Sequence, residues 1–196
     1  KFLKYKNIII IGIGGSILGA KSIYHFLKKK IKREVFFFNN LDPNLNLKYK
    51  KIKNLKNSCF VVISKSGNTL ETIANLGVLG QKNLIKNKLI IITEITDSVL
   101  MEIANKYKAE IIEHRDFIGG RYSVLSETGM FPAALMGLNL TRFKNLKNLI
   151  KNKKFISILI QNVASIYTFN SKKINNSIII SYDSDLNDLG YWYQQL

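Results

Sequence analysis

Five short apolar runs, rich in isoleucine, valine and phenylalanine, alternate with stretches of helical periodicity in the first part of the chain. The runs are residues 7–13, 34–38, 59–64, 88–93 and 109–114. The helical segments between them are 17–30, 43–55, 69–82 and 97–107, of which 43–55 is the weakest. Continuous apolar runs are typical of strands buried on both faces of a parallel sheet. The repeated order predicts an α/β fold: a doubly wound parallel sheet flanked by helices, with right-handed crossovers.

The pattern changes after the fifth run. Residues 125–139 predict an apolar helix interrupted by Pro132, and residues 143–171 predict a long helical region that is first basic and then apolar. A further strand is predicted over 177–181, and a helix that starts near Asp185 is still running at the last residue.

We therefore expect three parts: a first domain over residues 1–141, a helical connection over 142–171, and the start of a second α/β unit over 172–196. A helix at a natural C-terminus usually ends in a polar or glycine-containing stretch, and the final YWYQQL does not. We interpret the second unit as cut off and the chain as a fragment.

The charge of the chain is strongly basic, with 30 lysines and arginines against 13 acidic residues and a formal net charge of +17. Such a charge raises the question of a nucleic-acid partner. The lysines, however, mix with asparagine and isoleucine throughout the chain and form no single block interleaved with aromatic residues. They are interpreted as solvated surface positions. We expect no nucleic-acid partner, although a basic surface would favour small anionic substrates.

The cysteine and histidine content indicates neither a disulfide framework nor a structural metal site. Cys59, the single cysteine, lies within an apolar run and is interpreted as a small buried hydrophobe. His25 and His114 have no ligand-like spacing to a second histidine or cysteine. No apolar run is long enough to cross a bilayer, and the first residues lead into a strand with no room for a signal peptide. We expect a cytoplasmic protein with no membrane partner.

Ligands of doubly wound sheets bind outside the carboxyl ends of the strands, where three loops of this chain are expected. The first is GIGGSILGA, residues 12–20, whose glycines allow close backbone approach and whose Ser16 would stand at a helix N-terminus. It is a poor dinucleotide fingerprint, because Leu18 replaces the third glycine and the next strand ends without an acidic residue. The alternative interpretation is a tight strand-to-helix turn.

The second loop lies in VISKSGNTLET, residues 61–71. Ser64, Ser66 and Thr69 present hydroxyl groups, Gly67 frees the backbone, and the following helix contributes unpaired amides and a partial positive charge. Such a set predicts a cradle for a monophosphate group without a Walker-type sequence.

A simpler interpretation of the second loop is a helix N-cap, with Asn68 or Thr69 as the capping residue and a glutamate three positions on. Capping needs only one hydroxyl or amide group. It leaves Ser64, Lys65 and Ser66 unexplained, so we favour the phosphate site.

The third loop is IGGRYSVLSETG, residues 118–129. Two glycines before Arg121 suggest that this arginine is displayed from a tight turn, where its guanidinium could stabilise an oxyanion formed during a reaction. The alternative is a structural ion pair of Arg121 with Glu127 or Asp116. The spacing alone does not choose between these two interpretations.

The segments IGIGGSILGA, VISKSGNTLET and FIGGRYSVLSETGMFPAALMG, in this order, resemble the glucose-6-phosphate isomerase (phosphoglucose isomerase) family. The first half of that family is a sugar-isomerase (SIS) domain with a flavodoxin-like fold. The tail YDSDLNDLGYWYQQL is similar to the family's segment leading into its catalytic glutamate. The serine-lysine-serine loop is shared with many phosphosugar-binding domains, whereas GGRYS is much more specific.

The resemblance implies the reversible isomerisation of glucose 6-phosphate and fructose 6-phosphate, in glycolysis and gluconeogenesis, without a metal or organic cofactor. By motif, it implies that Ser64, Ser66 and Thr69 hold the sugar phosphate, with Lys65 contributing backbone. Asn68 stands where the family usually has threonine, at a position that does not contact the ligand.

The resemblance also implies roles around the reacting end of the sugar. Gly15 and Ser16 fall where the family's first loop lines the substrate, Arg121 matches the arginine that stabilises the cis-enediolate, and Gln195 matches a glutamine that contacts substrate. The full-length family is typically a homodimer that completes its site with a histidine from the partner.

The family's catalytic base, a glutamate expected shortly after Gln195, lies beyond this sequence, as do its ring-opening histidine and lysine. Glu71 and Glu127 are better interpreted as supports for the loops. We therefore expect this chain alone to bind phosphosugar weakly and not to isomerise it at a useful rate. A dual phosphoglucose/phosphomannose isomerase and a non-catalytic SIS-domain sugar-phosphate sensor are the alternatives.

Overall fold

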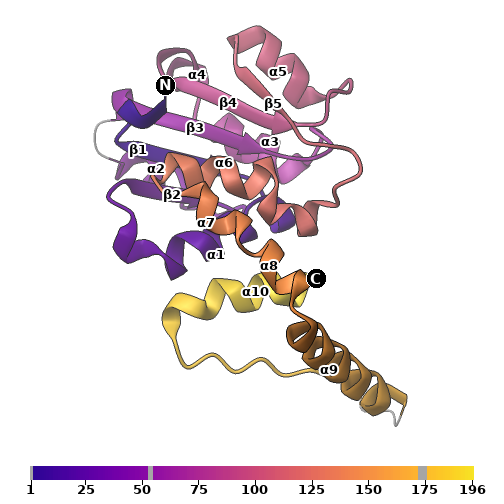
Figure 1. Ribbon diagram of the computed structural model, residues 1–196. Coiled ribbons are helices and arrows are strands. Elements are labelled where there is room, and N and C mark those ends of the chain that lie inside the picture. The colour runs from indigo at the N-terminus through magenta and orange to yellow at the C-terminus, as the bar shows by residue number, and fades with distance from the viewer. Residues whose placement is uncertain (1, 53–54, 172–175) are drawn as a thin grey trace. The chain divides into compact units, whose positions relative to one another are not determined.

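The computed structural model describes residues 2–52, 55–171 and 176–196 (Figure 1). Its central feature is a five-stranded sheet in the order β2-β1-β3-β4-β5, in which every pair of neighbouring strands is parallel. The strands are β1 (Asn7–Ile11), β2 (Glu34–Phe38), β3 (Ser58–Ile63), β4 (Lys88–Thr93) and β5 (Glu110–Glu113). This order is that of flavodoxin-like doubly wound sheets, and the predicted fold class is confirmed.

The strands are apolar throughout because both faces of the sheet are covered. Along β1 and β3 every residue is buried. Since successive side chains of a strand point to opposite faces, Ile9 and Ile11 enter one core layer, while Ile8 and Ile10 enter the other. Burying such a side chain contributes about 1.5–3 kcal/mol, so the central strands carry much of the folding free energy.

Helices cover both faces of the sheet (Figure 1). The layer that contains Ile9 receives apolar side chains from α2 (Leu45–Lys50), α3 (Leu70–Val78), α4 (Gln81–Lys86) and α5 (Val99–Tyr107). The opposite layer is packed by α1 (Leu18–Phe26) and α6 (Glu127–Leu135). The chain thus crosses one face after β1 and the other after β3, which places a topological switch point between these two strands.

The predicted helix over 69–82 is divided into α3 and α4 in the structure. Gly80 lies between the two helices with φ of +72°, a left-handed conformation that glycine adopts without steric cost. The first helix therefore ends before this residue, and a new one begins after it.

The chain separates into two compact units, one of residues 1–138 with 183–196 and the other of residues 139–182. In the first unit, the short 3₁₀ turn Ser184–Leu186 leads into α10 (Asn187–Gln195), which packs against α1. The predicted C-terminal helix is thus present. The domain boundaries at 141 and 171, and a second α/β unit over 172–196, stay predictions, and residues 172–175 lie outside the described ones.

The second unit contains α7 (Leu140–Lys144), α8 (Lys147–Lys151) and α9 (Lys153–Ser171), where one helical region over 143–171 was predicted. Asn152 interrupts it: its backbone is extended, and its side-chain oxygen accepts a hydrogen bond from the amide of Phe155, which caps α9. No helix in the described ranges is long and apolar enough to cross a membrane.

The predicted strand over 177–181 is wrong for this structure. These residues have no regular secondary structure, and Ile178 is 85% exposed. A strand is stabilised by pairing with a neighbour, and no described strand pairs with this segment.

Candidate functional site

The loops after β1 and β3 flank the switch point of the sheet. The two strands are paired with Ile11 opposite Val62, so their following loops begin side by side. A Cβ atom on Gly12 would lie 2.9 Å from the carbonyl oxygen of Ile63, so only glycine fits at this approach. In doubly wound sheets the crevice at such a point is where ligands bind.

The loop of residues 64–69 has the geometry of a compact cradle. Ser64 is buried, and its hydroxyl oxygen lies 2.8 Å from that of Thr69. Gly67 adopts a φ of +68°, and a Cβ atom there would collide with the side chain of Ser98. The carbonyl of Gly67 accepts a hydrogen bond of 3.1 Å from the amide of Leu100 in α5. The loop is therefore held on two sides, by its own hydroxyls and by the start of α5.

The N-cap interpretation of these residues does not match the geometry. Thr69 is the N-cap residue of α3, but its side chain makes no capping hydrogen bond. Asn68 instead accepts a hydrogen bond from the amide of Val99 at 3.0 Å, which ties the loop to α5. The first amides of α3 thus lack a side-chain cap, and unpaired amides at a helix N-terminus attract an anion.

The other two predicted phosphate residues lie in the same loop. Ser66 is exposed, and its hydroxyl oxygen accepts a long hydrogen bond of 3.3 Å from the amide of Asn68. The Lys65 ammonium donates to the carbonyl oxygen of Asp116 at 2.6 Å and lies 3.4 Å from the carboxylate of Glu94. The charge of Lys65 is therefore committed to the protein, and its side chain joins the loop to the segments that follow β4 and β5.

The first predicted loop, residues 12–20, contains a 3₁₀ turn over Gly14–Ser16. This turn packs directly against the third predicted loop, residues 118–129. A Cβ atom on Gly15 would lie 2.5 Å from the backbone nitrogen of Arg121 and 2.6 Å from the carbonyl carbon of Gly120. Gly14 has a φ of +55° and lies against the side-chain amide of Gln195. Gly14 and Gly15 therefore allow close contacts with Gln195 and with the Arg121 segment. A tight strand-to-helix turn alone would not require these contacts.

Arg121 lies at the start of a second 3₁₀ segment, Gly120–Leu125. The buried Ser123 closes this turn by donating its hydroxyl to the carbonyl of Gly120 at 2.6 Å. The indole nitrogen of Trp192, from α10, donates to the carbonyl of Arg121 at 3.0 Å. The backbone of Arg121 is thus fixed from the α1 side by Gly15 and from the α10 side by Trp192.

The structural ion pair considered for Arg121 is absent from the described part of the chain. Glu127 lies 4.0 Å from Arg115, and the carboxylate of Asp116 accepts a hydrogen bond from the amide of Phe117. The Arg121 residue is exposed, and no described carboxylate lies within ion-pair distance of its guanidinium. This leaves the charge available to a ligand.

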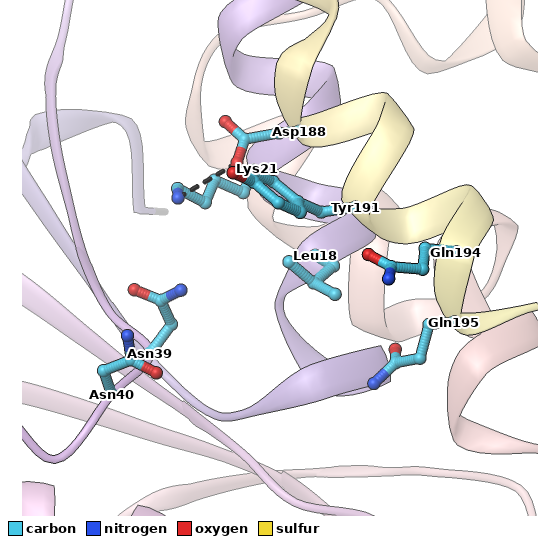
Figure 2. Close-up of a pocket in the computed structure, with 8 residues that line it drawn as sticks. All are labelled: Leu18, Lys21, Asn39, Asn40, Asp188, Tyr191, Gln194 and Gln195. Atoms are coloured by element: carbon cyan, nitrogen blue, oxygen red, sulfur yellow. Dashed lines mark ion pairs between the residues drawn. The ribbon is translucent and has the colours of Figure 1, made fainter. Parts of the chain in front are cut away.

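Gln195 borders a pocket of about 520 Å³ at the same end of the sheet (Figure 2). Its walls come from the start of α1, from Asn39 and Asn40 after β2, and from Tyr191, Gln194 and Gln195 of α10. The side-chain oxygen of Gln195 is buried and has no hydrogen-bond partner among the described residues.

Two residues of α10 were not among the predicted site residues, yet they support the site. Trp192 binds the Arg121 turn, and Asp188 is buried between Lys21 and His25 of α1. The sequence offered one hint, since Trp192 is the only tryptophan of the chain. In the described ranges, no group of three histidine, cysteine or acidic side chains is arranged to hold a metal ion.

Comparison with known proteins assigns the chain to a family. The family model described as phosphoglucose isomerase matches residues 2–196, nearly the whole sequence. The chain belongs to the phosphoglucose isomerase family. Among relatives, it is 31% identical over 202 residues to a glucose-6-phosphate isomerase of Methanocaldococcus jannaschii, an alignment that covers 98% of this chain and 49% of that protein. The same enzyme of Mesomycoplasma hyopneumoniae is 35% identical, with coverage of 96% and 48%.

One solved structure agrees with this phosphoglucose isomerase assignment, and a second shows the same fold. A glucose-6-phosphate isomerase from Chlamydia trachomatis superposes with a TM-score of 0.56 and 32% identity, covering 65% of this chain and 26% of that one. A hypothetical protein from Thermus thermophilus has the same fold, with a TM-score of 0.80, 22% identity, and coverage of 97% and 48%. The chain spans about half the length of the curated phosphoglucose isomerase relatives it matches.

Proposed function

We propose that this chain is the phosphosugar-binding half of a glucose-6-phosphate isomerase, which interconverts glucose 6-phosphate and fructose 6-phosphate. The observation that carries the proposal is the direct contact of Gly15 with the backbone of Gly120 and Arg121 at the switch point, beside the hydroxyl cradle. The contact joins the first loop to Arg121, which has no ion-pair partner among the described residues, and Gly12 of the same loop lies against Ile63, directly before the cradle. A phosphate-binding loop and an unpaired arginine are two of the features that a phosphosugar isomerase needs. The names of the relatives supply glucose 6-phosphate, and the family resemblance implies fructose 6-phosphate as the second sugar.

The phosphate end of the substrate would lie on the loop of residues 64–69. The hydroxyls of Ser64, Ser66 and Thr69 can donate to phosphate oxygens, and the uncapped start of α3 adds backbone amides and a partial positive charge. The phosphate takes no part in the chemistry. Its binding energy instead holds the reacting carbons in a fixed position, which lowers the entropic part of the barrier.

The reacting end would lie toward Arg121. Isomerisation moves a proton between C1 and C2 through a cis-enediolate, and negative charge develops on its oxygens. A guanidinium that is exposed to the ligand and not paired with a described carboxylate can stabilise this charge more strongly in the transition state than in the ground state. Gly15 and Ser16 would line the substrate, and the unsatisfied oxygen of Gln195 would accept a hydrogen bond from a sugar hydroxyl.

A base for the proton transfer would come from outside these residues. Two described glutamates near the loops lie beside basic side chains: Glu94 beside Lys65, and Glu127 beside Arg115. Since the relatives are about twice as long, we propose that the base lies in the part of the protein that this chain does not contain. We also propose that the full-length enzyme is a cytoplasmic homodimer. The chain alone would then bind the substrate without turning it over.

Calorimetry on the 196-residue chain tests this proposal. We expect glucose 6-phosphate and fructose 6-phosphate to bind, glucose to bind far more weakly, and a coupled assay to show no useful turnover. Equal affinity for glucose and its phosphate would contradict the phosphate cradle. Near-normal turnover would contradict the proposal that the base lies elsewhere.

A further inference from the structure

A buried carboxylate joins α10 to α1 at the edge of the site. Asp188 is 6% exposed, and its carboxylate lies 3.0 Å from the Lys21 ammonium and also pairs with the imidazole of His25 (Figure 2 shows the pair with Lys21). Removing a carboxylate from water is costly unless it is paired, so this arrangement strongly favours one position of the helix. Asp188 also lies in the first turn of α10, where the helix dipole favours an anion.

The same helix carries the two residues that contact the other loops. One turn beyond Asp188, Trp192 donates to the carbonyl of Arg121, and further along Gln195 lies against Gly14. The residues before position 183 belong to a separate compact unit, so chain connectivity does not by itself place α10 on α1. The contacts of α10 with α1 must do so.

We propose that Asp188 is a positioning residue for the phosphosugar site: its ion pair with Lys21 and its contact with His25 fix α10, and α10 in turn fixes the Arg121 turn and Gln195. This inference rests on the proposed function. Asp188 itself does not touch the reacting atoms. Its effect reaches the ligand through Trp192, the only tryptophan, which therefore also reports on the position of α10.

The test compares Asp188→Asn with Asp185→Asn, a matched control. Asp185 precedes Asp188 by one turn and is only partly buried, and both variants lose one negative charge. A purely electrostatic effect would raise the affinity for an anionic sugar in both variants. Loss of positioning lowers the affinity for glucose 6-phosphate in Asp188→Asn alone, by about fivefold or more, because small misplacements of binding groups are costly.

Tryptophan fluorescence supplies a second measurement that does not depend on the ligand. At a temperature at which far-UV circular dichroism shows each variant folded, we expect the Trp192 emission of Asp188→Asn to shift to the red and to be quenched more easily by acrylamide. Asp188→Glu should restore part of both properties. If Asp188→Asn does not fold, Lys21→Gln replaces it and is compared by Trp192 emission and acrylamide quenching alone, because losing a positive charge weakens binding of an anionic sugar by itself; unchanged Trp192 properties would then overturn the positioning role.

The two proposals fail in different ways. If Asp188→Asn matches Asp185→Asn in both Trp192 accessibility and affinity, the positioning role is overturned. If the unmodified chain does not bind glucose 6-phosphate, the proposed function fails, while the fluorescence comparison still decides whether Asp188 fixes α10.

Discussion

The hydroxyl oxygens of Ser64 and Thr69 lie 2.8 Å apart, although the two residues stand at opposite ends of the loop between β3 and α3. The hydrogen bond closes the loop on itself. Thr69 makes no capping hydrogen bond to α3, so the helix amides are left to an incoming anion. The hydroxyl groups of Ser64 and Thr69 therefore bond to each other and close the loop, and Thr69 does not cap the helix.

Replacing the hydroxyl group of Thr69 by a methyl group is expected to weaken phosphate binding. Thr69→Val keeps the shape of the side chain but removes a donor to a charged phosphate, a hydrogen bond worth about 1.5–3 kcal/mol. Affinity for glucose 6-phosphate should fall by about tenfold to about a hundredfold. Calorimetry measures the change, with Thr141→Val, at an exposed position of the second unit, as the control. Unchanged affinity in Thr69→Val would argue for a purely structural hydroxyl.

Removal of the Arg121 charge is expected to affect ligand binding but not folding. Because Arg121 has no described ion-pair partner, Arg121→Gln should leave the melting temperature unchanged. It should weaken binding of a phosphorylated five-carbon aldonate, whose carboxylate imitates the enediolate, by about tenfold or more. Arg115→Gln, which removes the long pair with Glu127, is the control. An equal loss of affinity in both variants would indicate a general effect of charge.

The close approach of the first and third loops predicts a strong effect at Gly15. In Gly15→Ala the new Cβ atom would lie 2.5 Å from the nitrogen of Arg121, so one backbone must move. We expect a lower melting temperature and weaker binding of glucose 6-phosphate. Gly77→Ala is the opposite control: it lies in α3, where the new Cβ would meet nothing within 4 Å apart from the backbone of its own helix, and it should stabilise the chain by about 0.5–1 kcal/mol.

If the Gly15→Ala variant has the melting temperature of the unmodified chain and the same affinity for glucose 6-phosphate, the first and third loops are not in contact in solution. Thermal denaturation and calorimetry on the same three proteins decide this.

Alkaline pH is expected to destabilise the fold in part through Cys59. Burial raises the pKa of this thiol from its ordinary value of 9.0 to about 12, because the charged thiolate is disfavoured away from water. The contribution of the buried thiol to the free energy of unfolding is fully present below pH 9, where the thiol holds its proton in both the folded and the unfolded chain. It is lost as the pH rises from 9 to 12, because the unfolded chain then releases its proton first.

The burial of Tyr49, which raises its pKa to about 12, acts in the same direction. Urea unfolding at about pH 8 and about pH 11 should show a smaller loss of unfolding free energy in Cys59→Ala than in the unmodified chain. An identical loss in the two proteins would contradict the assignment to the thiol.

Local features of the sequence were sufficient for the fold class and for grouping the residues of the proposed phosphate loop, whose role stays a prediction. The continuous apolar runs predicted all five strands of the sheet, because burial on both faces selects the residue types of each strand independently of the others. Ser64, Ser66 and Thr69 could be grouped because they lie within one short loop, whose residues remain neighbours in any fold.

The tertiary structure decided the contacts between distant parts of the chain. The bond from Trp192 to Arg121 joins residues 71 positions apart, and the pair of Asp188 with Lys21 depends on α10 packing against α1. The predicted strand over 177–181 was wrong for a related reason: a strand needs a partner, and its own residues cannot show whether one is present. Residue types set which local conformations are stable, whereas pairing and packing set which distant groups meet.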